Sequence, residues 1–137
     1  AGNAGSRVGR GVCLKPGASK EFVIVEAAMS DLLRPALYQA WHEVLAVDRG
    51  RNCKMRECDI VGPVCETGDF IARDRQLAVA PGDLVAVRSV GAYGFVMASN
   101  YNARPRPAEV MVDGDRLHVV REREQTADLF ASETLLP

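Results

Sequence analysis

Short stretches of β-branched and other apolar residues, each bounded by turn residues, limit the fold of this chain most strongly. Residues 20–28 (KEFVIVEAA) and 84–93 (LVAVRSVGAY) predict buried strands. Alternating apolar residues on both sides of Asp113 and Gly114 predict a β-hairpin. The pattern therefore predicts a mainly β domain, a barrel or a two-layer sandwich, with short helices. Further strands are expected over residues 12–15, 41–48 and 58–65.

Short helices are expected beside these strands. Residues 31–40 (DLLRPALYQA) predict the first helix, with Ser30 and Asp31 as candidate N-caps. Residues 126–133 (TADLFASE) predict the second helix, capped by the threonine with which the segment begins. Two segments fit no single element. Residues 66–83 are interpreted as turns mixed with short apolar stretches, and residues 94–102 as either a strand or a short helix.

Charge and composition exclude several kinds of partner. The net charge is -1, which gives no general attraction to nucleic acid or to an anionic membrane. No apolar run approaches the roughly 20 residues that cross a bilayer, and no secretory signal opens the sequence. The four cysteines lack the spacing of a zinc site, so we expect no metal and reduced thiols in a cytoplasmic protein.

The sharpest chemical signal is Cys65 followed directly by Glu66, in the turn PVCETGDF. A carboxylate beside a thiol disfavours the thiolate, so the pair is unsuited to a nucleophile. It suits a protonated thiol that delivers a proton, beside a carboxylate that binds an ammonium group. The alternative interpretation is an ordinary thiol in a surface turn.

Two weaker signals involve an arginine and two tyrosines. Arg34 and Tyr38 are four residues apart, so on a helix they share a face and can hold a carboxylate together. Tyr93 lies in the loop GAYG, where the backbone can approach a bound group closely. The alternatives are a surface arginine with a half-buried tyrosine, and a packed tyrosine in a turn. His42 and His118 are interpreted as ordinary strand residues.

Four long segments resemble the C-terminal half of the diaminopimelate decarboxylases, which belong to the alanine-racemase-like fold type of pyridoxal-phosphate enzymes. The resemblance extends over about residues 1–130. Ornithine and arginine decarboxylases share part of it, but RPALY and the Glu directly after the Cys favour the diaminopimelate branch. The segments are RPALYQAWHEV, DIVGPVCETGDFIARDR, GDLVAVRSVGAYGFVMASNYNARPRPAEVMVDGDR and REREQTADLF.

The resemblance implies a particular domain organisation. These enzymes have an N-terminal (β/α)8 barrel, which carries the lysine that bonds pyridoxal phosphate, and a C-terminal β-domain that faces the partner subunit of a homodimer. Residues 1–137 would be the single C-terminal β-domain, and the barrel would be its partner. The resemblance places the cofactor lysine outside Lys15, Lys20 and Lys54. The chain alone is therefore expected to be inactive.

The resemblance also implies roles for the candidate residues. Cys65 would donate a proton in the partner subunit's site, where meso-2,6-diaminopimelate is decarboxylated to L-lysine. Glu66 would bind the distal amino group of this substrate, while Arg34 and Tyr38 would bind its distal carboxylate. Tyr93 would contact the cofactor phosphate and the substrate. The alternatives are a related decarboxylase of another basic amino acid, and a non-catalytic interaction or regulatory β-domain that has kept the motifs.

Overall fold

The computed structural model describes residues 2–50 and 52–136, which divide into two compact units. The first unit extends to Ala98, and the second begins at Ser99. Each unit is described separately below, and the single domain expected over residues 1–137 stays a prediction. Within the described residues, no helix has the length and apolar character needed to cross a membrane.

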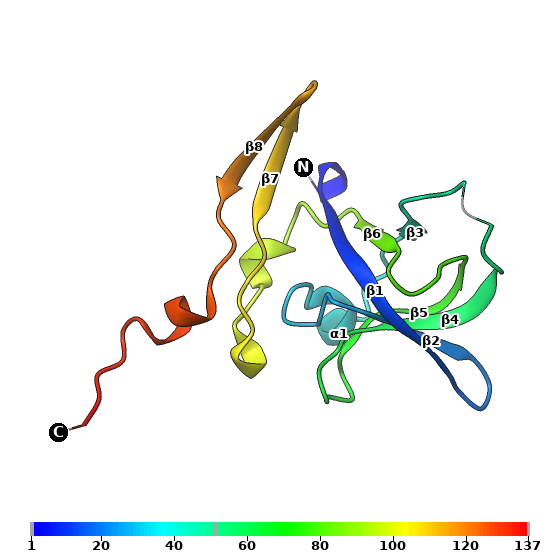
Figure 1. Ribbon diagram of the computed structural model, residues 1–137, viewed down its shortest axis with the longest axis horizontal. Helices are drawn as coiled ribbons and strands as arrows, with labels where there is room; N and C mark the ends of the chain where they lie inside the picture. The colour runs from blue at the N-terminus through cyan, green and yellow to red at the C-terminus, as the bar shows by residue number, and fades with distance from the viewer. Residues whose placement is uncertain (1, 51, 137) are drawn as a thin grey trace. The chain divides into compact units, whose positions relative to one another are not determined.

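A six-stranded, strongly curved sheet forms the first unit (Figure 1). The strand order is β3-β6-β1-β2-β4-β5, and every neighbouring pair is antiparallel except β2 and β4. The two edge strands, β3 and β5, contact each other, so the sheet nearly closes into a barrel. The mainly β prediction is confirmed, and of its two forms the barrel is observed. The strands are β1 (Ser6–Pro16), β2 (Glu21–Val25), β3 (Val44–Ala46), β4 (Arg56–Val61), β5 (Phe70–Leu77) and β6 (Leu84–Arg88).

Strand β1 bends the sheet because it pairs with two different neighbours. Its first half, from Ser6 to Arg10, pairs with β6, whereas its second half, from Gly11 onward, pairs with β2. The register shifts between Gly11 and Cys13, which is the signature of a β-bulge. Bulges increase local twist and turn the corners of barrels. The strand expected over residues 12–15 is therefore only the second half of a much longer strand.

Apolar side chains from alternate positions of the strands fill the interior of the barrel. Val23 and Val25 of β2, for example, are buried, whereas Phe22 and Ile24 are only partly buried. This alternation is what a half-buried strand requires. The largest fully buried side chains of the interior are Leu32, Ile60, Ile71 and Val23.

Strand β5 was not predicted from the sequence, and β3 was predicted to be longer than it is. Residues 70–77 form a complete strand, although the segment was expected to be turns and short apolar stretches. Its polar run, which includes Asp74 with a positive φ of 54°, hides the period of two. Conversely, the strand expected over residues 41–48 is limited to Val44–Ala46, and Trp41 before it is exposed.

The first helix is shorter than expected and has a different beginning. Helix α1 comprises Arg34–Tyr38, follows Leu33 as its N-cap and receives no side-chain cap. The predicted capping role of Ser30 and Asp31 is therefore wrong. Asp31 instead accepts a hydrogen bond from the Ala28 N–H at 2.9 Å, because the chain forms a separate turn before the helix. Two short 3-10 turns complete the unit, η1 (Gly2–Ala4) and η2 (Phe95–Met97).

The second unit contains the predicted hairpin. Strands β7 (Glu109–Asp113) and β8 (Arg116–Arg121) pair in antiparallel fashion across a turn at Gly114 and Asp115. The 3-10 turns η3 (Tyr101–Ala103) and η4 (Thr126–Phe130) flank the hairpin. The predicted threonine cap of the last helix is wrong, since Gln125 forms a reciprocal capping box with Asp128.

Glu124 organises the hydrogen bonding of the second unit. Its carboxylate accepts bonds from the Arg106 backbone N–H and from the Asn100 side chain, both at 2.7 Å, and forms an ion pair with the Arg106 guanidinium. The pKa of Glu124 is lowered to about 2, and the largest cause is its hydrogen bond with the Arg106 side chain. Three donor groups, the Arg106 N–H, the Arg106 guanidinium and the Asn100 amide, thus bond one carboxylate.

Replacement of Glu124 should remove an acid-sensitive part of the stability of this unit. Because the folded pKa lies below the ordinary value of 4.5, the stabilisation is complete above that pH and is lost as the pH falls toward about 2. The Glu124→Gln variant should therefore unfold more easily than wild type at about pH 6 and equally easily near pH 2. Urea titrations that follow NMR signals of β7 and β8 measure this, with Glu133→Gln as a control. An equal deficit at both pH values would contradict the assignment.

Candidate functional site

The turn that carries Cys65 and Glu66 joins β4 to β5. Strand β4 ends at Val61, directly before Gly62 and Pro63, because proline cannot donate a ladder hydrogen bond. The strand expected over residues 58–65 is accordingly interrupted there, and Cys65 lies in the turn. Both Cys65 and Glu66 are exposed to solvent. The turn thus presents a thiol and a carboxylate side by side on the surface of the first unit.

The backbone of this turn is closed by short hydrogen bonds. The Glu66 N–H donates to the Val64 carbonyl at 2.8 Å, and the Asp69 N–H donates to the Glu66 carbonyl at 3.0 Å. The Gly62 N–H donates to the Asp69 carbonyl at 2.9 Å. Asp69 in the same turn is buried, which the sequence pattern did not indicate. Its side chain accepts the Val64 N–H of the same turn and the distant Met29 N–H, both at 2.7 Å, and no local motif signals the second of these bonds.

Helix α1 carries Arg34 and Tyr38 at its two ends. The buried Pro35 anchors the first turn, and the helix stops at Gln39, which adopts a left-handed conformation with a φ of 54°. The Tyr38 side chain is 63% exposed. The helix contacts β5, the strand that begins directly after the Cys65 turn. The helix that carries Arg34 and Tyr38 therefore lies against the strand that follows the Cys65 turn.

Tyr93 lies in a tight turn after β6. Its φ of 61° is in the left-handed region, which is uncommon for an aromatic residue. The turn is fixed to the start of the chain, because the Gly91 N–H donates to the Gly2 carbonyl and the Val90 N–H to the Gly5 carbonyl, both at 3.0 Å. Tyr93 is nevertheless 61% exposed. Backbone strain combined with an exposed phenol is typical of functional positions.

The structure brings Arg34 and Tyr93 together. The Cζ atom of Arg34 lies 5.9 Å from the centroid of the Tyr93 ring, at the outer limit of a cation–π contact. This proximity was not predicted, because the two residues are far apart in sequence. The turn with Cys65 and Glu66 is joined to the segment before α1 by a hydrogen bond from the Met29 N–H to Asp69. Three segments of the first unit therefore carry the five candidate residues, namely α1, the turn between β4 and β5, and the turn after β6.

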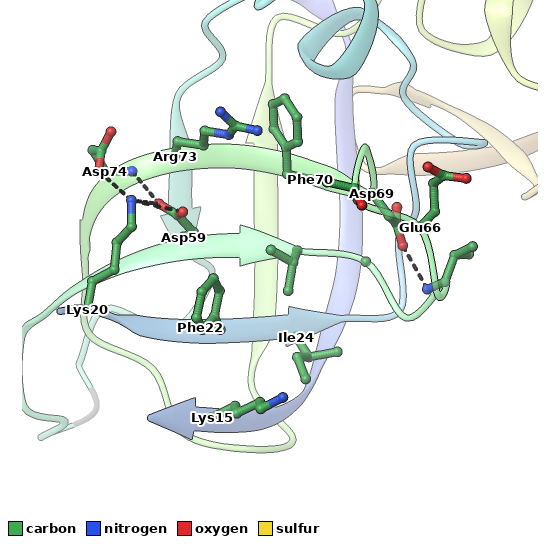
Figure 2. A pocket seen from close by; sticks show the side chains of 14 residues that line it. Lys15, Lys20, Phe22, Ile24, Asp59, Glu66, Asp69, Phe70, Arg73 and Asp74 are labelled. Carbon is green, nitrogen blue, oxygen red and sulfur yellow. Dashed lines mark hydrogen bonds and ion pairs between the residues drawn. The ribbon is translucent and has the colours of Figure 1, made fainter. Parts of the chain in front are cut away.

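A groove of about 460 Å³ begins beside Glu66 and ends at an ion-pair cluster (Figure 2). In that cluster the Lys20 ammonium bonds Asp74 at 2.8 Å and Asp59 at 3.0 Å. These two bonds raise the pKa of Lys20, and the bond to Asp74 is the larger cause. Lys20 in turn lowers the pKa of Asp74. Lys20 is thus held as a protonated ion-pair partner, which is unsuited to bonding a carbonyl compound as a free amine. Its role in the structure is to join β2, β4 and β5.

The four cysteines are free thiols in different surroundings. Cys58 is completely buried, and burial is the largest cause that raises its pKa to about 11, so this thiol is inert. Cys53 is partly buried, whereas Cys13 and Cys65 are exposed. Only Cys65 among them lies in a turn directly beside a carboxylate, which distinguishes it chemically from the exposed Cys13 on β1.

The curved sheet with its exposed polar turns is a C-terminal sheet domain of the kind that pyridoxal-dependent decarboxylases contain, and the model of that domain matches residues 3–91. The chain belongs to the pyridoxal-dependent decarboxylase family, which confirms the resemblance noted in the sequence. It is 61% identical over 135 residues to diaminopimelate decarboxylase of Pseudomonas aeruginosa, covering 98% of this chain and 32% of that protein.

Solved structures give the same relationship. A diaminopimelate decarboxylase from M. jannaschii, in complex with L-lysine, is 38% identical with a TM-score of 0.94, covering 99% of this chain and 31% of that one. The Helicobacter pylori diaminopimelate decarboxylase, also in complex with L-lysine, is 40% identical with a TM-score of 0.88, covering 96% and 32%. The chain thus spans about a third of the length of these relatives.

A substitution at Gly94 should displace the turn that carries Tyr93. A Cβ atom at this position would lie 2.2 Å from the Val90 carbonyl oxygen, so the backbone would have to move. We expect Gly94→Ala to lower the free energy of unfolding by about 1–3 kcal/mol. Gly50→Ala is the control, since its nearest atom lies 3.5 Å away. Chemical denaturation measures both variants, and equal stability of Gly94→Ala and wild type would refute the close approach.

Proposed function

We propose that this chain is the C-terminal domain of a diaminopimelate decarboxylase, an enzyme that converts meso-2,6-diaminopimelate to L-lysine and CO2. The observation that carries the proposal is the 61% identity to the Pseudomonas aeruginosa enzyme over nearly the whole chain. An N-terminal barrel domain and a second subunit would complete the active site. The coverage of about a third of each relative supports a further domain in the complete protein.

Arg34, Tyr38 and Glu66 would recognise the end of the substrate that does not react. Diaminopimelate carries an amino acid group at both ends, so its distal end is a zwitterion. An arginine fork and a tyrosine hydroxyl can bind its carboxylate, while a carboxylate can bind its ammonium group. The proximity of Arg34 to Tyr93, and the exposure of Tyr38 and Glu66, support this division of roles. A substrate without a distal carboxylate would leave Arg34 without its ligand.

The residues of this chain fit a supporting role toward pyridoxal phosphate. The exposed Tyr93 hydroxyl, on a strained and firmly anchored turn, can donate a hydrogen bond to a phosphate. Lys20 is held in ion pairs, and the family resemblance implies that the lysine that bonds the cofactor belongs to the barrel domain. When bound, pyridoxal phosphate supplies an electron sink for the electron pair that the departing CO2 leaves behind. The chain alone would therefore be inactive.

Cys65 would return a proton to the carbon that has lost CO2. General acids act only within hydrogen-bond reach of the accepting atom. An exposed thiol at the end of a hydrogen-bonded turn can extend into a site on another subunit, which a buried thiol such as Cys58 cannot do.

Loss of the Cys65 thiol should reduce turnover in the full-length enzyme. We expect Cys65→Ala to lower kcat by roughly 100-fold or more, within the range that general acid catalysis contributes, with a smaller change in KM. Release of CO2 from diaminopimelate measures this. Cys13→Ala is the matched control, because it removes the other exposed thiol. Wild-type turnover of Cys65→Ala would support the non-catalytic alternative.

Loss of Arg34 should mainly weaken substrate binding. We expect Arg34→Ala to raise KM and to lower kcat/KM, because the distal carboxylate loses its charged partner. The lost transition-state stabilisation, calculated from kcat/KM, should be about 2–4 kcal/mol. Arg34→Lys should recover only part of this, since an ammonium lacks the fork geometry. Arg49→Ala, in an exposed loop, is the control. Unchanged kinetics for Arg34→Ala would remove this residue from the substrate site.

A further inference from the structure

A buried carboxylate lies directly beneath the Cys65 turn. Asp69 is 4% exposed. Its Oδ2 atom accepts a hydrogen bond from the Val64 N–H, and its Oδ1 atom accepts one from the Met29 N–H, both at 2.7 Å. Among the described residues no lysine or arginine forms an ion pair with it. The two backbone donors therefore satisfy a buried charge, and such charge-assisted bonds are stronger than neutral ones.

The glycine at position 62 leaves the space that this carboxylate occupies. A Cβ atom at Gly62 would lie 2.3 Å from Oδ2 and 2.4 Å from Oδ1 of Asp69, so any side chain there would displace the carboxylate. Gly68 in the same turn differs, because its nearest atom, the Met29 Sδ, lies at an ordinary 3.5 Å. The Asp69 carboxylate thus occupies the space that a side chain at position 62 would need.

Asp69 connects the two segments that carry the proposed substrate-binding residues. Val64 directly precedes Cys65, and Met29 begins the turn that leads to Arg34. That turn is held from its other side by Asp31, which accepts the Ala28 N–H at 2.9 Å and pairs with Arg7 at 3.2 Å. Figure 2 shows the Asp69 side chain between β5 and the loop that carries Glu66.

We propose that Asp69 is a positioning residue for the proton donor: its carboxylate fixes the turn of Cys65 and Glu66 against the segment that precedes Arg34. This inference rests on the proposed function of Cys65. The reason is geometric, because a proton donor displaced by about 1 Å can lose much of its effect. Asp69 touches neither the substrate nor the reacting carbon and acts only through the backbone of Val64 and Met29.

The test uses the full-length enzyme and a double-mutant cycle. Asp69→Asn replaces one acceptor oxygen with an NH2 group, which cannot accept the second N–H. We expect this variant to lower kcat roughly 10-fold in wild type but by less than about 3-fold in a Cys65→Ala background, where there is no donor left to position. Gly62→Ala should reproduce the effect by displacing the carboxylate. Gly68→Ala should leave kcat unchanged, since its Cβ atom has room.

Amide hydrogen exchange provides a readout that does not depend on activity. The Val64 and Met29 amides should exchange at least about 10-fold faster in Asp69→Asn and in Gly62→Ala than in wild type. Unchanged exchange would overturn the proposal, and so would an equal loss of kcat in both backgrounds, which indicates general destabilisation. Wild-type turnover in Cys65→Ala alone would instead refute the proposed function of Cys65 as the proton donor. The exchange rates would still decide whether Asp69 holds the turn.

Discussion

The bend of β1 is the constraint on which the rest of the first unit depends. One strand pairs with β6 along its first half and with β2 along its second, and the register shift after Gly11 turns the sheet toward closure. The start of the same strand, with the residues just before it, also fixes two segments of the candidate site. The Gly2 and Gly5 carbonyl groups, which precede β1, hold the turn of Tyr93, and Arg7 of β1 pairs with Asp31 before α1. Sheet curvature and site geometry therefore have a common origin.

A few buried or half-buried carboxylates each have a separate structural role. Asp69 accepts backbone N–H groups without a cation, whereas Asp59 binds Lys20 and also accepts the Asp74 N–H at 2.8 Å. Buried charges persist only where hydrogen bonds or opposite charges replace their lost hydration. Exposed ion pairs contribute little to stability by comparison.

The fold class and the hairpin could be predicted from the sequence because both depend on local patterns. Apolar alternation on each side of a turn specifies β7 and β8 whatever surrounds them. Strand β5 was missed because Arg73, Asp74 and Arg75 interrupt its period, and only the folded chain supplies the Lys20 ammonium that pairs with Asp74. The helix cap was placed wrongly because Asp31 matches the capping pattern, whereas in the folded chain its carboxylate accepts the Ala28 N–H of the preceding turn.

The sequence by itself determined the mainly β class, the family resemblance and the identity of the five candidate residues, because residue type and spacing along the chain carry that information. Only the tertiary structure decided that Arg34 lies beside Tyr93, that Cys65 is exposed while Cys58 is buried, and that Asp69 lies beneath the turn. These properties depend on which distant segments meet when the sheet closes. Contacts between residues far apart in the chain follow from the curvature of the whole sheet, which no short motif specifies.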